Sequence, residues 1–272
     1  MTDTAAIAPD TGVSAPVLYS VENEIATITL NRPERMNALS AEMRRLIIDA
    51  LVAAPQEARV VVMTGAGAGF CAGQDLADGD AGKTAADIDL ERTLAEEYEP
   101  MLRLIAECPV PVIAAVNGVA AGAGANLALA ADIVIAGQSA SFIEAFARIG
   151  LIPDAGGTYW LPRLVGQARA MGMCLTAEPV EAARAAEWGL IWEVVPDDAL
   201  KAHVDALAAR LATGPTVAYR LAKQALRASA DNNFEAQLAL EARLQGEAGR
   251  TRDFAEGVLA FLEKRPARFE GR

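Results

Sequence analysis

The sequence contains few of the residues that bind metals or form disulfide frameworks. There are three cysteines and one histidine among 272 residues. Cys71, Cys108 and Cys174 are widely spaced and have no histidine or second cysteine beside them, so we predict neither a disulfide framework nor a metal site. Free thiols suit a reducing compartment, and we expect a cytoplasmic protein. The single histidine, His203, has no serine or cysteine beside it, which argues against triad chemistry.

Basic residues and long apolar runs are also scarce. Lys and Arg number 24 against 36 Asp and Glu, which gives a formal net charge of −12. Because nucleic-acid binding needs clustered positive charge, we expect no nucleic-acid partner. No apolar run is long enough to cross a bilayer, so we expect no membrane partner. The first residues lack the basic and apolar regions of a targeting signal, and we interpret 1–16 as a flexible tail.

The residues that are present predict an α/β fold. Hydrophobic residues make up 53% of the chain, enough for one large domain with an appendage. Glu24–Asn31 alternates β-branched residues with Ala, Ile and Leu, which predicts a strand. Ser40 suits the N-cap of a helix with an apolar stripe, which we expect Pro55 to end. Arg59–Thr64 is a continuous apolar run, as in a strand buried on both faces.

A glycine-rich loop follows that strand. Gly65–Leu76 lies where an α/β sheet presents backbone to a ligand. It is not a phosphate-binding P-loop, because no Gly-Lys-Ser/Thr follows, and the acidic residue of a dinucleotide site is absent. The polar, acidic segment Ala77–Asp89 predicts a mobile surface segment. Ile88–Glu107 then predicts a helix.

The stretch from Asn117 to Gly157 is the most informative part of the chain. It begins with a glycine-alanine turn between the predicted strand Val112–Val116 and a helix around Ala123–Ala131. Such a turn leaves the first helical amides free to hold a negatively charged oxygen at the positive end of the helix dipole. Close packing of the helix on the sheet explains the same glycines, and the turn alone does not separate the two interpretations. A strand at Ile133–Ala136 follows.

Beyond Asp154 the chain is predicted to form short helices and one more strand before it becomes all-helical at Ala199. Helices are predicted at Gly156–Val165, Ala168–Leu175 and Val180–Trp188, followed by a last strand at Glu193–Val195. From Ala199 to Lys264 the pattern is almost wholly helical, with breaks near residues 214–215 and 231–232. We therefore divide the chain into a core, 17–200, and a C-terminal helical region, 201–272. Apolar helices that project from a core need a partner, so this region suggests subunit contacts.

Four ordered motifs resemble the crotonase, or enoyl-CoA hydratase/isomerase, superfamily. They are NRPERMNALS at 31–40, TGAGAGFCAGQDL at 64–76, PVPVIAAVNGVAAGAGANLALAADIVIA at 109–136 and IGLIPDAGGTYWLPRLVG at 149–166. The resemblance implies a spiral of ββα units with a C-terminal helical trimerisation region, assembled as a homotrimer or a dimer of trimers. FCAGQDL, GLIPDAGG, AEWGLIW at 186–192 and LEKRPARF at 262–269 resemble the ring-1,2-epoxyphenylacetyl-CoA isomerases more narrowly.

The resemblance implies an oxyanion site and one acid/base carboxylate. The main-chain amides of Gln74 and Ala123 would hold the thioester oxygen as it becomes an enolate, and two such donors lower that barrier. Asp154 occupies the position of the acid/base carboxylate of similar isomerases, and its apolar neighbours should raise its pKa. Asp154 also precedes a predicted helix, so it suits an N-cap, and the two roles do not exclude each other.

The positions of the two glutamates of water-adding relatives correspond here to Asn126 and Phe146. Neither side chain can transfer a proton. Glu144, two residues before Phe146, shares its face in an extended segment and could carry a displaced role. A loop or ion-pair residue is the alternative interpretation of Glu144.

The resemblance implies coenzyme A as part of the substrate, with no tightly bound cofactor. The residues expected at the nucleotide and pantetheine are Arg32, Ala38, Ala72, Gln74, Asp75 and Leu76, with Ala123 at the thioester and Phe261 and Lys264 reaching in from a neighbouring subunit. The alternative interpretation of Lys264 is that its positive charge stabilises the C-terminal end of a helix through the helix dipole.

The sequence therefore predicts an acyl-CoA isomerase that shifts 3-enoyl-CoA to 2-enoyl-CoA and converts ring-1,2-epoxyphenylacetyl-CoA to oxepin-CoA. An enoyl-CoA hydratase and a non-catalytic acyl-CoA-binding protein are the alternatives.

Overall fold

The computed structural model describes residues 15–77 and 89–272, so most of the predicted surface segment Ala77–Asp89 and of the predicted tail lies outside the described residues. A six-stranded sheet has the order β1-β2-β3-β5-β7-β10, and a four-stranded sheet has the order β4-β6-β8-β9. The larger sheet is parallel except for the β1–β2 pair, and the smaller one is parallel except for β8–β9. The strands are β1 (Val17–Glu22), β2 (Ile25–Leu30), β3 (Val60–Gly65), β4 (Gly69–Cys71), β5 (Val112–Val116), β6 (Val119–Ala121), β7 (Ile133–Gly137), β8 (Ser141–Ile143), β9 (Val180–Glu181) and β10 (Glu193–Val195).

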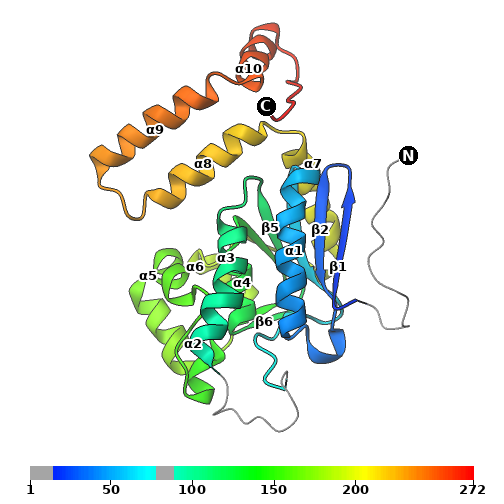
Figure 1. The fold of residues 1–272 in the computed structure, drawn as a ribbon, viewed down its shortest axis with the longest axis vertical. Coiled ribbons are helices and arrows are strands. Elements are labelled where there is room, and N and C mark those ends of the chain that lie inside the picture. The colour runs from blue at the N-terminus through cyan, green and yellow to red at the C-terminus, as the bar shows by residue number, and fades with distance from the viewer. Residues whose placement is uncertain (1–14, 78–88) are drawn as a thin grey trace.

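Helices surround both sheets (Figure 1). The α-helices are α1 (Ala41–Glu57), α2 (Leu90–Thr93), α3 (Glu99–Ala106), α4 (Ala123–Leu129), α5 (Gly157–Thr176), α6 (Ala182–Trp188), α7 (Leu200–Ala212), α8 (Thr216–Ala228), α9 (Phe234–Ala248) and α10 (Arg252–Glu263). Short 3-10 turns are η1 (Pro33–Arg35), η4 (Ala145–Ile149) and η5 (Asp197–Ala199), and a π-helical turn, η3 (Leu94–Tyr98), joins α2 to α3.

The chain passes repeatedly from the large sheet to the small one and then into a helix. β3 and β4 lead to α2–α3, β5 and β6 lead to α4, and β7 and β8 lead to α5. This repeat of two strands and a helix is the spiral expected for the crotonase fold, and the predicted fold class is confirmed. The glycine-alanine turn before α4 contains the short strand β6. Three residues are too few to show the alternating pattern by which a strand is predicted.

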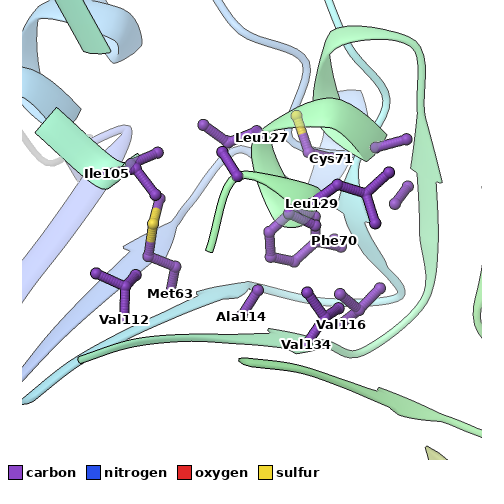
Figure 2. Packing of buried hydrophobic residues seen from close by; sticks show 14 of the residues in the cluster. Met63, Phe70, Cys71, Ile105, Val112, Ala114, Val116, Leu127, Leu129 and Val134 are labelled. Carbon is purple, nitrogen blue, oxygen red and sulfur yellow. The ribbon is translucent and has the colours of Figure 1, made fainter. Parts of the chain in front are cut away.

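The strands of the large sheet are buried on both faces. On β3, Val61 and Met63 belong to the main core, which also includes residues of α1, α3 and α4. Val60 and Val62 belong to a second cluster on the opposite face, under α7. Figure 2 shows Phe70 and Leu129 between α4 and the neighbouring strands of the main core. This explains why the RVVVMT segment is continuously apolar.

The helix α1 confirms its predicted start and corrects its predicted end. The Ser40 hydroxyl accepts a hydrogen bond from the Met43 amide at 3.2 Å, as an N-cap does. Pro55 does not stop the helix, which continues to Glu57. A proline removes one N–H donor, but its fixed φ is helical, so the last turn can include it.

Three further boundaries differ from the prediction. The two helices predicted between 156 and 175 form one element, α5, with a kink at Gly166. Val180 begins a strand, β9, and the helix starts only at Ala182. A third break, between α9 and α10, separates helices in the C-terminal region, where no proline marks it.

The C-terminal helices differ in what they pack against. Val204, Ala208 and Ala212 of α7 pack on the large sheet, whereas α8 and α9 pack on each other and project from the core, with α10 at the far end (Figure 1). The division of the chain at residue 200 stays a prediction. Within 15–77 and 89–272, none of the helices combines the length and apolarity needed to cross a bilayer.

Candidate active site

Two turns distant in sequence meet at the N-terminus of α4. Gly73 lies in the loop after β4 with a φ of +92°, a conformation that side chains rarely adopt. A Cβ at Gly73 would lie 2.7 Å from the Ala121 carbonyl oxygen and 3.4 Å from the Ala123 nitrogen. The loop and the helix start can therefore approach only because residue 73 is a glycine.

The amides of Gln74 and Ala123 are placed at this junction. The Leu39 amide donates to the Gly73 carbonyl at 2.7 Å, and the Asp75 amide donates to the Leu39 carbonyl at 3.2 Å. In this parallel pairing the Gln74 amide points away from Leu39. Ala123 is the first residue of α4, so its amide has no acceptor within the helix. This arrangement can provide two backbone donors for a developing oxyanion.

Asp154 lies on the loop between η4 and α5. Its residue is half-buried, and its Oδ1 atom is buried and has no hydrogen-bond partner in the described structure. Burial raises the pKa of Asp154 to about 6, close to values useful for proton transfer near neutral pH.

The N-cap interpretation of Asp154 is wrong. Gly156 is the N-cap of α5, and the helix start receives no side-chain cap. Ala155 and Gly156 both have positive φ values, of 48° and 83°. This tight turn directs the Asp154 carbonyl, not its carboxylate, to the Gly157 amide at 2.8 Å. Within the described residues, the Oδ1 atom of the carboxylate is thereby left without a hydrogen-bond partner.

Asn126 and Glu144 lie next to Asp154. The Asn126 Nδ2 atom donates to the Asp154 carbonyl at 2.9 Å and to Glu144 Oε2 at 3.3 Å. Glu144 is 1% exposed. The ion-pair interpretation of Glu144 is not supported, because among the described residues its side chain accepts a hydrogen bond from Asn126 and contacts no cation. Phe146 is buried and its ring lies 3.6 Å from where Gly122 would carry a Cβ.

A largely apolar cleft of about 960 Å³ opens beside Asp154. One wall comes from α2, η3 and α3, and the other from the loop at 151–156 and the start of α5. Tyr98, Leu102 and Trp160 are among the large side chains that line it. The cleft can hold an acyl chain or a ring with its reacting carbon near the carboxylate.

The sequence reasoning missed a polar cluster that holds the Gln74 side chain. Gln74 Oε1 accepts hydrogen bonds from Arg44 Nη1 at 2.9 Å and from the Tyr98 hydroxyl. Arg44 is 3% exposed and also donates to Glu97 Oε2 at 2.9 Å. These contacts tie the Gln74 loop to α1 and to η3. The available signal was the position of Arg44, which falls three residues before Ile47 on the apolar stripe of α1.

The residues expected near the nucleotide form a second group. Arg32 Nη1 contacts Asp75 Oδ2 at 2.8 Å and the Ala38 carbonyl at 2.7 Å, and the Ala72 amide donates to the Met36 carbonyl at 2.9 Å. Burial alone would raise the pKa of Asp75, but the hydrogen bonds from Arg32 and the Ala77 amide outweigh it and lower that pKa overall. Leu76, in the same loop, is 66% exposed.

Phe261 and Lys264 are not brought to this group within one chain. Both belong to the end of α10, which lies far from α2 and α4 in Figure 1. Phe261 is 83% exposed. Lys264 adopts the left-handed conformation that ends the helix. Their predicted contact from a neighbouring subunit stays a prediction.

The remaining candidate residues lie elsewhere. His203 on α7 contacts Glu193 at 2.9 Å on the surface, as expected for a residue outside the site. The described residues contain no group of three or more His, Cys, Asp or Glu placed to hold a metal ion.

Comparison with known proteins identifies relatives over most of the chain. Residues 20–272 match the family described as Enoyl-CoA hydratase/isomerase. A probable enoyl-CoA hydratase of Rhodobacter capsulatus is 59% identical over 256 residues, which cover 94% of this chain and 98% of that protein. The 1,2-epoxyphenylacetyl-CoA isomerase of Escherichia coli is 48% identical over 258 residues, with 94% and 98% covered. The solved structure of an enoyl-CoA hydratase from Bacillus anthracis, 33% identical, superposes with a TM-score of 0.88 over 94% of this chain and 100% of that chain.

Proposed function

Because the chain belongs to the enoyl-CoA hydratase/isomerase family, we propose that it is an acyl-CoA isomerase that moves the double bond of a 3-enoyl-CoA to the 2-position. The observation that carries this proposal is the half-buried carboxylate of Asp154 on a largely apolar cleft, where burial raises its pKa. The positions at which water-adding relatives would carry glutamates hold Asn126 and Phe146. One carboxylate is enough for a shift of one proton, because the same group can accept and return it.

In the proposed reaction, Asp154 removes a proton from the carbon next to the thioester carbonyl. The bonding electrons move into the thioester, and the amides of Gln74 and Ala123 hold the oxygen of the resulting dienolate. The protonated Asp154 then returns the proton two carbons away, which leaves the double bond conjugated with the thioester. No atom is gained or lost.

The proposal extends to an aromatic-ring epoxide as the acyl group. The 48% identity to the 1,2-epoxyphenylacetyl-CoA isomerase supports this extension, and the cleft has the volume and the apolar walls for a ring. The same two amides would stabilise the thioester while the ring epoxide rearranges to the seven-membered oxepin. Coenzyme A would be held as part of the substrate by the group around Arg32 and Ala72, with no other cofactor.

An enoyl-CoA hydratase is the second candidate function. The 59% identity to a probable hydratase favours it, and Glu144 gives the site a second carboxyl group beside Asn126. In this case Glu144 and Asp154 would share the work of activating water and delivering a proton.

One pair of assays separates the candidates. Purified protein is given 3-hexenoyl-CoA, followed at the absorbance of the conjugated thioester, and crotonyl-CoA in parallel. An isomerase converts the first and does not hydrate the second at a comparable rate, whereas a hydratase hydrates crotonyl-CoA. Binding of both without conversion of either, or of the ring epoxide, would identify a non-catalytic acyl-CoA-binding protein.

Replacing Asp154 by Asn tests the assigned base. We expect Asp154→Asn to lower the turnover of 3-hexenoyl-CoA by roughly 10²- to 10⁴-fold, the usual contribution of a general acid/base, without unfolding the protein. Asp49→Asn, on an exposed part of α1, is the matched control and should behave as wild type. Near-normal turnover by the Asp154 variant would remove Asp154 from the mechanism.

A further inference from the structure

Glu144 is a buried carboxyl group that the proposed reaction does not use. It lies between β8 and η4 and is 1% exposed. The groups that face it are Asn126 from α4, Asp154 from the loop before α5, and the Cys174 thiol of α5, whose pKa is raised by burial and by Glu144. Arg148, on the adjoining turn, donates to the Ala177 carbonyl instead. Among the described residues no cation pairs with Glu144.

The amide of Asn126 connects Glu144 to the proposed base. Its Nδ2 atom has two hydrogens, and the structure assigns one to Glu144 Oε2 and the other to the Asp154 carbonyl. A Cβ at Gly157 would lie 2.5 Å from that nitrogen, so the amide is pressed against the start of α5. Glu144 therefore fixes the rotation of the Asn126 amide, which in turn holds the main chain of Asp154.

In the part of the chain that the structure describes, this cluster contains three buried polar atoms without a hydrogen-bond partner: Asn126 Oδ1, Glu144 Oε1 and Asp154 Oδ1. Two carboxylates cannot both be ionised in such surroundings without a large electrostatic cost. Burial raises the pKa of Asp154 to about 6. Burial raises the pKa of Glu144 to about 7, where the Asn126 hydrogen bond lowers it and the charge of Asp154 raises it further. Because Glu144 is almost fully buried and Asp154 is only half-buried, Asp154 ionises first, and its charge favours the protonated form of Glu144.

We propose that Glu144 is a positioning residue that works in its protonated form: it holds the Asn126 amide, and through it the main chain of Asp154, while Asp154 is ionised. Glu144 is not among the residues that line the cleft, whereas Asp154 is. It therefore acts on the base and not on the substrate. The proposal deepens the isomerase function and rests on it only for the role of Asp154 as base. The proton on Glu144 is a property of the free protein and does not depend on the reaction.

Infrared absorption of protonated carboxyl groups tests the proton on Glu144 without any turnover. We expect a pH titration of the full-length wild-type protein to show a buried carboxylic acid that persists above the ionisation of Asp154 and is lost near pH 7. Glu144→Gln should remove this signal. Asp154→Asn should move it to lower pH, because the neighbouring charge is gone. A Glu144→Gln spectrum identical to wild type between pH 6 and 7 would overturn the proposal.

Kinetics with 3-hexenoyl-CoA test the positioning. Glu144→Ala should lower kcat roughly tenfold with little change in KM, since a displaced base slows the chemical step more than binding. Glu144→Gln, which imitates the protonated acid, should restore most of that loss. The proposal is wrong if the kcat of Glu144→Gln is as low as that of Glu144→Ala, or if the kcat of Glu144→Ala equals that of wild type. Failure of the isomerase function itself would instead appear as absence of turnover in wild type, with the infrared titration unaffected.

Discussion

Within residues 15–77 and 89–272, neither buried Glu144 nor half-buried Asp154 has a cation as a partner for its carboxyl group. Asp75, which is 8% exposed, differs because Arg32 contacts it at 2.8 Å. An unpaired buried carboxyl group prefers its proton, so the folded protein holds protons that the unfolded chain has already released. The free energy of unfolding therefore decreases as the pH rises through the window between the unfolded and folded pKa values.

For Glu144 this window runs from the ordinary value of 4.5 to about 7. We expect Glu144→Gln to be more stable than wild type at pH 8 by on the order of 2–3 kcal/mol, and to lose this advantage below pH 5. Urea unfolding at several pH values measures the difference. Glu187→Gln, an exposed change on α6, is the control and should follow wild type at every pH. Parallel curves for wild type and Glu144→Gln would contradict the raised pKa.

At the scale of elements, the junction of the β4 loop with α4 determines whether the two proposed oxyanion donors, the amides of Gln74 and Ala123, meet. Gly73→Ala would place a Cβ 2.7 Å from the Ala121 carbonyl and would strain a φ of +92°. Since the neighbour is backbone, it cannot move aside without moving the Ala123 amide. We expect kcat to fall by roughly 10²- to 10³-fold, as when an oxyanion donor is lost.

Gly172→Ala is the matched control for this change. Gly172 lies within α5, and a Cβ there meets nothing within 4 Å. The substitution should leave kcat unchanged and stabilise the protein by up to about 1 kcal/mol, because alanine is the better helix former. Stopped-flow or steady-state assays of both variants, with thermal unfolding, give the comparison. Equal activity of the two variants would mean that the junction does not position the donors.

These elements also show what could and could not be predicted from the sequence. The strands β5 and β7 and the N-cap of α1 follow from local patterns, since apolar runs and capping residues act over a few residues. Three-residue strands such as β6 and β8 carry no readable period. The role of Arg44 depends on contacts with Gln74 and Tyr98, which are far apart in sequence. Asp154 was identified by resemblance, but its neighbour Glu144 could be weighed only once the fold had brought it to Asn126.

At the scale of the whole molecule, the far end of the C-terminal region leaves apolar side chains uncovered. On α10, Phe254, Val258 and Leu262 recur four residues apart and are 55%, 45% and 71% exposed, so they form a stripe on one face. A stripe of this kind on a projecting helix suits contact with another copy of this chain.

We expect the protein to form a homotrimer or a dimer of trimers through this region, and the double variant Val258→Asp with Leu262→Asp to form smaller assemblies. Buried carboxylates facing apolar side chains would oppose the contact. Sedimentation velocity measures the masses. Val52→Asp, which places the same charge at a 55% exposed valine of α1, should leave the assembly unchanged. A wild-type protein that sediments as a monomer would contradict the expectation directly.

The short helix α4 has a further consequence for how this molecule can change. All seven of its residues are buried, and it carries both the Ala123 amide and the Asn126 side chain that supports Asp154. The cleft proposed for the acyl group, by contrast, is lined mainly by α2, η3, α3, the loop at 151–156 and the start of α5. Apart from the loop that carries Asp154, the segments that hold the proposed reacting groups differ from those that line the cleft. Substitutions in the walls of the cleft, by evolution or in directed libraries, can therefore change the substrate preference without altering the Ala123 amide or the Asn126 side chain.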